Sequence, residues 1–241
     1  MKLLDILEDI IFPPACLYCG KFLGSGTRPL ICRECETKYG TPTGKCIRCN
    51  SDLEITENEF HCNTCRSARH PFDGVISAYF YEEKVRQAIV AHKFNFMYNH
   101  AKHLAVSISN IILKLFLTAP DYIVPVPTSK KRLYSRGYDP LLEIAECVSK
   151  NTGIPLNSKN LIKTKDTPHQ SSTTSRLQRF RNVRGAFSVK DKEFFNNKNI
   201  ILFDDVYTTG ASTYECAKIL KRAGAKHIII ATVAISDHFR R

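Results

Sequence analysis

The fold is decided by the stretch Ile200-Ile201-Leu202-Phe203-Asp204-Asp205-Val206-Tyr207-Thr208-Thr209-Gly210-Ala211-Ser212. It predicts a buried apolar strand that ends in two adjacent carboxylates, followed by a turn rich in threonine and glycine and then by a helix. Open α/β sheets bind ligands at the carboxyl ends of their strands, and the N–H groups of such a turn and helix start attract anions. Two acidic groups beside an anion site fit a ligand that also offers a neutral diol, or a divalent cation.

From about Pro71 onward the sequence alternates between strand and helix patterns. Strands are expected at residues 75–81, 122–126, 199–203 and 227–234, and helices at residues 84–92, 101–117, 141–150 and 211–223. Repeated β-α-β units predict an α/β domain with a mostly parallel sheet and helices on both faces. We expect this domain to span residues 71–241.

Residues 1–70 have a different pattern, dominated by cysteine. Eight of the ten cysteines form four C-x2-C pairs, and the last two pairs repeat the spacing of the first two. Thiolates at this spacing suit tetrahedral Zn²⁺, so we expect a small double zinc-ribbon module with two structural four-cysteine sites. One ion per repeat is favoured, and an interleaved pairing stays open. The expected ligands are Cys16, Cys19, Cys32, Cys35, Cys46, Cys49, Cys62 and Cys65.

The formal net charge of +12 at pH 7 is concentrated in one part of the chain. Residues 128–190 contain thirteen basic and four acidic residues, whereas residues 1–70 contain nine of each. Such a basic segment favours a polyanionic partner, either nucleic acid or a phosphorylated small molecule. The alternative is a solvated basic surface without a specific partner.

The sequence predicts a cytoplasmic protein without a membrane span. No stretch reaches the roughly 18 consecutive apolar residues that a spanning helix needs. The N-terminal apolar segment is interrupted by Asp5, Glu8 and Asp9, which does not fit a secretory signal peptide. In a reducing compartment, a cysteine-rich sequence indicates metal binding more than disulfide bonds.

The stretch 200–212 resembles the phosphoribosyl pyrophosphate (PRPP) motif of type I phosphoribosyltransferases, which implies a domain of that fold. The resemblance implies that Asp204 and Asp205 hold the ribose 2′ and 3′ hydroxyls, and that Mg²⁺ bridges the diol and the pyrophosphate. It places the 5′-phosphate on Thr208, Thr209, Gly210, Ala211 and Ser212. The plainer reading is a generic strand–turn–helix with an acidic rim.

Further stretches resemble the ComF competence family, including its ComFC and GntX-like members. These are Val124-Pro125-Val126-Pro127-Thr128 with Arg132 and the later Arg136-Gly137-Tyr138, the element His92-Lys93-Phe94, the series Gln170, Arg179, Asn182 and Gly185-Ala186-Phe187, and the double zinc module. The resemblance implies a cytosolic protein that handles incoming single-stranded DNA in naturally transformable bacteria.

The sequence also departs from these patterns. The ComF pattern RGFNQA is replaced here by Arg136-Gly137-Tyr138-Asp139-Pro140, which changes the groups near an expected pyrophosphate. The ComF pattern usually has a leucine three residues after the glutamine that corresponds to Gln170, and this sequence has Thr173 there. Thr208 stands where purine-salvage transferases carry an aspartate base. Because threonine cannot accept a proton near neutral pH, purine salvage is not expected.

Basic residues follow the strand expected at residues 122–126, where a type I fold binds pyrophosphate. Residues 163–184 predict a polar loop that would close over the ligand and exclude water. The same cations could instead follow a DNA backbone, with Tyr134, Tyr138, Phe180 and Phe187 as candidate stacking platforms, although a core position is favoured for Phe187. The candidates for either role are Thr128, Lys130, Lys131, Arg132, Arg136, Gln170, Arg179 and Arg181.

Three functions are compatible with these observations. The favoured one is a ComF-type protein of DNA uptake that binds PRPP or a nucleotide phosphate and handles single-stranded DNA. The second is an active phosphoribosyltransferase that transfers ribose 5-phosphate to an unidentified acceptor. The third is a regulatory protein that senses PRPP and docks a partner, such as a competence helicase, through its zinc module.

Overall fold

The computed structural model describes residues 15–24, 30–39, 70–94, 99–115, 120–167 and 175–236. Its central sheet has four strands in the order β1 (Gly74–Phe80), β6 (His227–Ile235), β5 (Asn199–Tyr207) and β2 (Tyr122–Pro125). All three strand pairings are parallel. The central strands β5 and β6 are almost continuous apolar runs, as expected for parallel strands that are buried on both faces.

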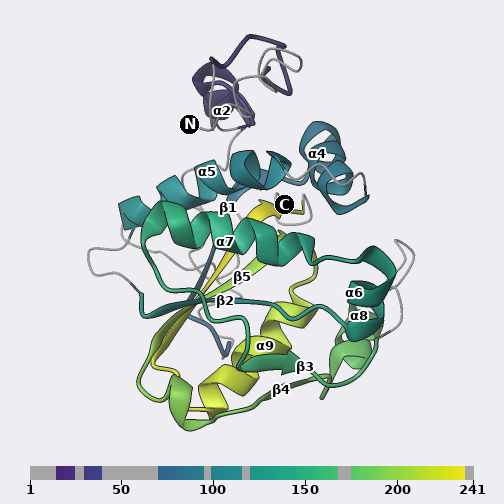
Figure 1. Ribbon diagram of the computed structural model, residues 1–241, viewed down its shortest axis with the longest axis vertical. Coiled ribbons are helices and arrows are strands. Elements are labelled where there is room, and N and C mark those ends of the chain that lie inside the picture. The colour runs from purple at the N-terminus through teal and green to yellow at the C-terminus, as the bar shows by residue number, and fades with distance from the viewer. Residues whose placement is uncertain are drawn as a thin grey trace, which may run out of the picture.

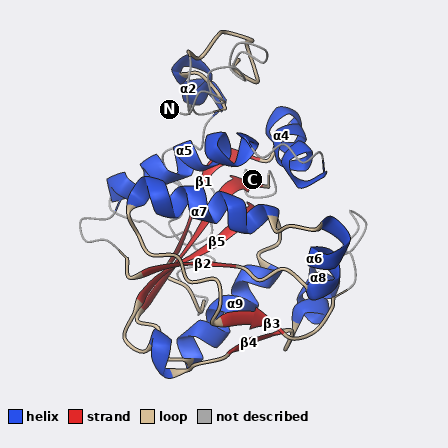
Figure 2. Ribbon diagram, in the orientation of Figure 1, coloured by secondary structure: helices blue, strands red, loops and turns tan. Residues whose placement is uncertain are grey.

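Helices cover the two faces of this sheet (Figures 1 and 2). On one face, α5 (Asn99–Leu115) packs beside α7 (Pro140–Thr152), and α4 (Glu83–Phe94) contacts α5. On the other face, α9 (Ala211–Arg222) packs against β5 and β6. This arrangement confirms the α/β class and the mostly parallel sheet with helices on both faces. Within the described parts of the chain, no helix is both long and apolar enough to cross a membrane.

A second, antiparallel pair of strands, β3 (Leu161–Lys163) and β4 (Phe187–Val189), lies beside α9. The short 3-10 helix η1 (Glu193–Phe195) leads into β5, and α2 (Arg33–Tyr39) belongs to the N-terminal module. The phenol of Tyr18 donates a 3.2 Å hydrogen bond to Glu82, directly before α4. The N-terminal module therefore contacts the rest of the chain at the start of that helix.

Two short helices lie in the basic part of the chain. Helix α6 (Lys130–Arg136) occupies most of the basic segment after β2, and α8 (Arg176–Val183) occupies the end of the predicted 163–184 loop. The expectation of a continuous loop over residues 163–184 was wrong for the part that forms α8. Serine N-caps begin both helices, because the Ser129 and Ser175 side chains accept hydrogen bonds from backbone N–H groups of the first turn.

Strand β5 is longer than the sequence predicted. It was expected to end at Phe203, but it continues to Tyr207 because its pairing with β6 extends to the partners Tyr207 and Ile235. Asp204 and Asp205 are therefore strand residues rather than the first residues of a turn. Since consecutive strand residues point to opposite faces, the two carboxylates leave β5 on different sides of the sheet.

Candidate functional site

A cleft of about 400 Å³ lies at the carboxyl ends of β2 and β5. Its walls come from these strand ends, from the C-terminal part of α4, from α6 and the start of α7, and from β3 and α8. Both Asp204 and Asp205 line it, although they leave β5 on opposite sides. The cationic lining residues Lys93, Arg132, Arg136, Lys163 and Arg179 outnumber the acidic ones, Asp139, Asp204 and Asp205. The cleft therefore favours a ligand with negative charge.

The two aspartates have different surroundings. Asp205 forms an ion pair with Lys93 of α4, and both side chains are mostly buried, with exposed fractions of 14% and 24%. The N–H group of Asp205 donates a 2.9 Å hydrogen bond to Oδ1 of Asp204. The charge of Asp205 raises the pKa of Lys93, although burial opposes this shift. Lys93 and Asp205 thus form a charged pair inside the cleft.

Asp204 is a weaker acid than an ordinary aspartate. Burial and the neighbouring charge of Asp205 raise its pKa to about 8, against the opposing effect of Lys93. At neutral pH Asp204 is therefore largely protonated, and its carboxyl group can donate a hydrogen bond as well as accept one. A neutral acid beside a carboxylate suits the hydroxyl groups of a sugar, because one group can donate a hydrogen bond while the other accepts one.

The turn between β5 and α9 forms a small hollow of about 30 Å³ that adjoins the cleft through Asp204, Thr208 and Ser212. Gly210 precedes α9 with a φ of 71°, and a β-carbon there would lie 2.6 Å from Cζ of Tyr207. Glycine is therefore required at this position. The hollow is lined by the residues that the motif assigned to a 5′-phosphate, namely Thr208, Thr209, Gly210, Ala211 and Ser212. The free N–H groups of a helix start also face this point.

The predicted pyrophosphate residues divide into two groups. Thr128, Arg132, Arg136 and Arg179 line the cleft. Lys130, Lys131 and Arg181 are exposed and lie outside its lining. Gln170 lies outside the described residues. Thr128 donates a 3.2 Å hydrogen bond to Asp139, which also caps α7.

Two cleft cations had no assigned role in the sequence analysis. Lys93 was noted only as part of a motif, and Lys163 was noted only as the start of a loop. Lys163 of β3 donates a 2.9 Å hydrogen bond to Thr167, and its Nζ lies 5.4 Å from the ring centroid of Phe187. Burial and the nearby Arg132 lower its pKa. No local pattern marks these lysines, because only the tertiary fold brings them to the aspartates.

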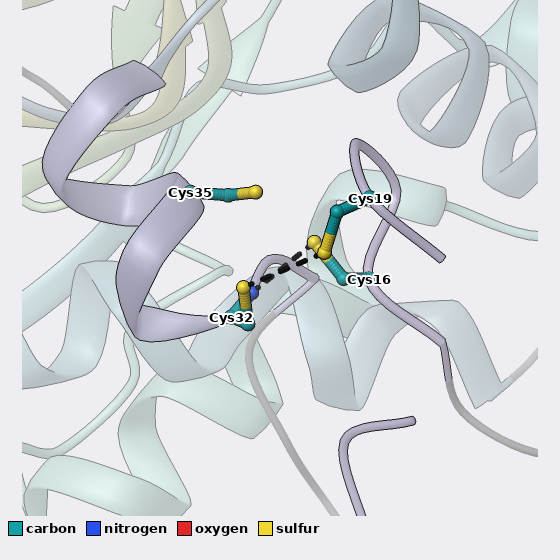
Figure 3. Close-up of side chains that lie close together, drawn as sticks. All are labelled: Cys16, Cys19, Cys32 and Cys35. Carbon is teal, nitrogen blue, oxygen red and sulfur yellow. Dashed lines mark hydrogen bonds between the residues drawn. The ribbon is translucent and has the colours of Figure 1, made fainter. Parts of the chain in front are cut away.

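The first four cysteines form a separate cluster in the N-terminal module (Figure 3). The sulfur atoms of Cys16, Cys19, Cys32 and Cys35 all lie within 4.8 Å of one another. This donor set fits one tetrahedral Zn²⁺ and supports one ion per repeat for this half of the module. Backbone N–H groups, including that of Cys32, outweigh burial and lower the pKa of Cys16 to about 6, which favours the thiolate. Cys46, Cys49, Cys62 and Cys65 lie outside the described residues.

Curated relatives cover most of the chain. Competence protein F of Haemophilus influenzae is 27% identical over 188 residues, which are 76% of this chain and 81% of that protein. The DNA utilization protein YhgH of Escherichia coli K12 is 26% identical over 203 residues, or 81% and 86% of the two chains. Competence protein ComFC of Bacillus subtilis is 25% identical over 80% of this chain and 79% of its own length.

The chain is a homologue of the ComF competence proteins. This finding confirms the resemblance drawn from the sequence motifs. No family model matches the sequence. Among solved structures, the allosteric regulatory enzyme of purine biosynthesis is 16% identical with a TM-score of 0.39, over 60% of this ComF homologue and 30% of the enzyme chain. The purine phosphoribosyltransferase of Pyrococcus horikoshii is 20% identical with a TM-score of 0.33, over 63% and 73% of the two chains.

Proposed function

We propose that this protein binds a phosphoribosyl group, that of PRPP or of a nucleotide, and that it handles single-stranded DNA during natural transformation. One observation supports this choice of ligand. The cleft places a hydroxyl-rich turn at a helix start next to two aspartates, and its lining contains more cationic than acidic side chains. A phosphate fits the turn, a sugar diol fits the aspartates, and further phosphates fit the arginines of α6 and α8.

The aspartate pair fits a directly bound Mg²⁺ poorly. Asp205 already has a cationic partner in Lys93, which a directly bound Mg²⁺ would have to displace. Magnesium ordinarily binds to one or two ionised carboxylates together with substrate phosphates. Any Mg²⁺ that accompanies PRPP would therefore be held by the ligand's own pyrophosphate.

The DNA part of the proposal is supported by the relatives, which are named for competence and for DNA utilization. Helix α6 contributes Arg132 and Arg136 to the cleft and presents Lys130, Lys131 and the 86% exposed Tyr134 outside it. Cations beside an exposed aromatic ring suit the backbone and bases of a single strand. This surface would guide DNA in the cytoplasm, and the zinc module would dock a partner such as a competence helicase.

Transfer of ribose 5-phosphate is the second candidate. The volume of about 400 Å³ falls within the range of small-molecule sites and leaves room beside the sugar for an acceptor. Release of pyrophosphate from PRPP across a panel of bases and amines tests this activity. If Asp205→Asn abolishes the release, the cleft is an active site; if no acceptor yields pyrophosphate, the binding role stands alone.

Calorimetric titration of the full chain with PRPP tests the proposal directly. Binding should weaken at least about tenfold in Asp205→Asn and stay unchanged in Asp121→Asn, which alters an aspartate at the other end of the sheet. A short 5′-phosphorylated oligonucleotide should compete with PRPP better than the same oligonucleotide without the phosphate. If the wild type binds neither PRPP nor the oligonucleotide, the proposed function is wrong.

A further inference from the structure

Lys93 reaches the aspartates from a different element of the fold. It lies near the C-terminal end of α4, and its ammonium group pairs with Asp205 at the end of β5. Only 24% of the lysine side chain and 14% of the aspartate side chain are exposed. Because the pair is mostly buried, removing either partner would leave the other charge uncompensated in a poorly hydrated place.

The segment that carries Lys93 is tied to the start of α7 and to the residues just before it. Tyr138 donates a 2.6 Å hydrogen bond to the backbone oxygen of His92, the residue before Lys93. The fully buried ring of His92 forms a 2.9 Å hydrogen bond with the backbone oxygen of Pro140. These two bonds tie the end of α4 to the start of α7, so the lysine is held in position before any ligand arrives.

The pairing has a consequence for ligands. A divalent cation that approached Asp205 would have to displace a lysine that the fold already places there. Mg²⁺ loses its water reluctantly and gains little from a carboxylate whose charge is already compensated. A sugar hydroxyl, in contrast, can donate to Asp205 while the ion pair stays intact, because a carboxylate offers about four acceptor positions.

We propose that Lys93 is a resident cation of the cleft that occupies the place of a divalent metal at Asp205 and makes ribose-phosphate binding independent of such a metal. Its ammonium group orients the Asp205 carboxylate toward the sugar and adds positive charge for the phosphate. The ligand part of this inference rests on the proposed function, whereas the exclusion of metal from Asp205 does not.

The exclusion of metal can be measured without any organic ligand. Mn²⁺ is titrated into the zinc-loaded full chain and followed by electron paramagnetic resonance. Wild type and Lys84→Met, which changes an exposed lysine of the same helix, should bind no Mn²⁺ at Asp205. Lys93→Met should gain a Mn²⁺ site at least about tenfold tighter than any Mn²⁺ binding of the wild type to this cleft. Lys93→Met/Asp205→Asn should lose that site. Lys93→Arg keeps the charge and should behave as wild type.

Two results would overturn this part of the inference. One is a Mn²⁺ site in the wild type that Asp205→Asn removes. The other is the absence of a new site in a folded Lys93→Met variant, with the fold verified by circular dichroism. The double variant guards against misfolding, because it removes both charges and leaves neither buried alone.

Binding of ribose 5-phosphate, which has no pyrophosphate to carry Mg²⁺, tests the ligand part. The wild-type affinity should change less than about threefold when Mg²⁺ is added to metal-free buffer. Lys93→Met should bind at least about tenfold more weakly without Mg²⁺ and recover when Mg²⁺ is added. Wild-type binding that occurs only with Mg²⁺ would overturn the inference and leave the proposed function standing. If the wild type binds ribose 5-phosphate under neither condition, the proposed function fails as well, and the Mn²⁺ result alone decides what Lys93 does.

Discussion

The phenol of Tyr138 donates a 2.6 Å hydrogen bond to the backbone oxygen of His92 and so joins the α6–α7 connection to the end of α4. The ComF pattern has phenylalanine at the position of Tyr138. The hydroxyl is therefore a feature in which this sequence departs from that pattern. The hydroxyl forms a bond to the end of α4 that a phenylalanine could not form. It holds the residue that precedes Lys93.

Tyr138→Phe should therefore lower the free energy of unfolding by about 1 kcal/mol, the usual net contribution of one hydrogen bond. The effect arises because the backbone oxygen of His92 loses a donor in a partly buried place. Urea denaturation measures it, with Tyr134→Phe as the control, since that ring is 86% exposed. Equal stabilities of the two variants would show that the hydroxyl of Tyr138 contributes nothing beyond a surface phenol.

Gly210→Ala should cost at least about 2 kcal/mol of stability and weaken PRPP binding about tenfold. The new methyl group would meet the buried ring of Tyr207, and the left-handed φ of 71° is itself unfavourable for alanine. Gly153→Ala is the matched control, because its φ is 73° and nothing lies within 4 Å of the added carbon. That control should cost about 1 kcal/mol and leave binding unchanged. Similar losses in both variants would contradict the close approach at Tyr207.

The raised pKa of Asp204 predicts a pH-dependent stability. In the unfolded chain this carboxyl ionises near pH 4, but in the fold it keeps its proton until about pH 8. Between these values the native state binds more protons than the unfolded state, so this group makes stability fall as the pH rises. Asp204→Asn removes the effect. The variant should gain stability over the wild type as the pH increases from 5 to 8, in urea titrations at several pH values.

Asp121 provides a control whose effect should not depend on pH in this series, because its pKa is shifted downward rather than upward. Its carboxylate accepts a 2.8 Å hydrogen bond from the N–H group of Asn199, and its pKa is lowered mainly by that bond. Because Asp121 is ionised in both states above pH 5, the loss caused by Asp121→Asn should be the same at pH 5 and at pH 8. A pH-independent difference between Asp204→Asn and the wild type would contradict the protonated state of Asp204.

The central sheet could be predicted because its strands carry their own signal. Runs such as Ile200–Phe203 are fully buried in the structure. Because both of their faces are covered, every position is apolar, and the run is recognisable in the sequence. The extension of β5 to Tyr207 could not be predicted in the same way. It depends on pairing with β6, and Asp204 and Asp205 would be poor strand residues without that partner.

The short helices and the cleft lysines were missed for different physical reasons. Helices α6 and α8 have only 7 and 8 residues, too few for a repeating apolar face, although their capping serines Ser129 and Ser175 were visible in the sequence. Lys93 and Lys163 lie far from Asp205 along the chain. Their roles follow from how α4 and β3 pack around the end of β5, which no local pattern reports.

The exposed face of α6 predicts how DNA binding should respond to salt. If Lys130 and Lys131 each neutralise one phosphate, Lys130→Ala/Lys131→Ala should reduce the slope of log Kd against log salt concentration by about 1.4 for a single strand. Fluorescence anisotropy with a labelled oligonucleotide measures the slope. Lys192→Ala/Lys226→Ala removes the same charge from exposed positions outside the cleft lining and should leave the slope nearly unchanged.

Tyr134 separates stacking from charge on the same helix. Tyr134→Ala should weaken single-strand binding by about 1 kcal/mol or more without changing the salt slope, because base stacking releases no counterions. If the two double variants lose affinity equally and Tyr134→Ala loses none, DNA does not bind along α6.

Removing one residue of the cysteine cluster should lower the zinc content of the protein without changing its affinity for PRPP. Cys19→Ser should reduce the zinc content of the purified chain by about one ion, since four thiolates that lie within 4.8 Å of one another form one site and three hold zinc weakly. Elemental analysis measures the ion, with Cys147→Ser as the control, because that residue of α7 lies outside the cluster. PRPP affinity should stay within about twofold of wild type, since no described residue before Tyr81 lines the cleft and Tyr138 ties the end of α4 to the α6–α7 connection. A tenfold loss of PRPP affinity in Cys19→Ser would mean that the contact between Tyr18 and Glu82 transmits the state of the module to α4, and the separation of a metal site from a ligand site would have to be abandoned.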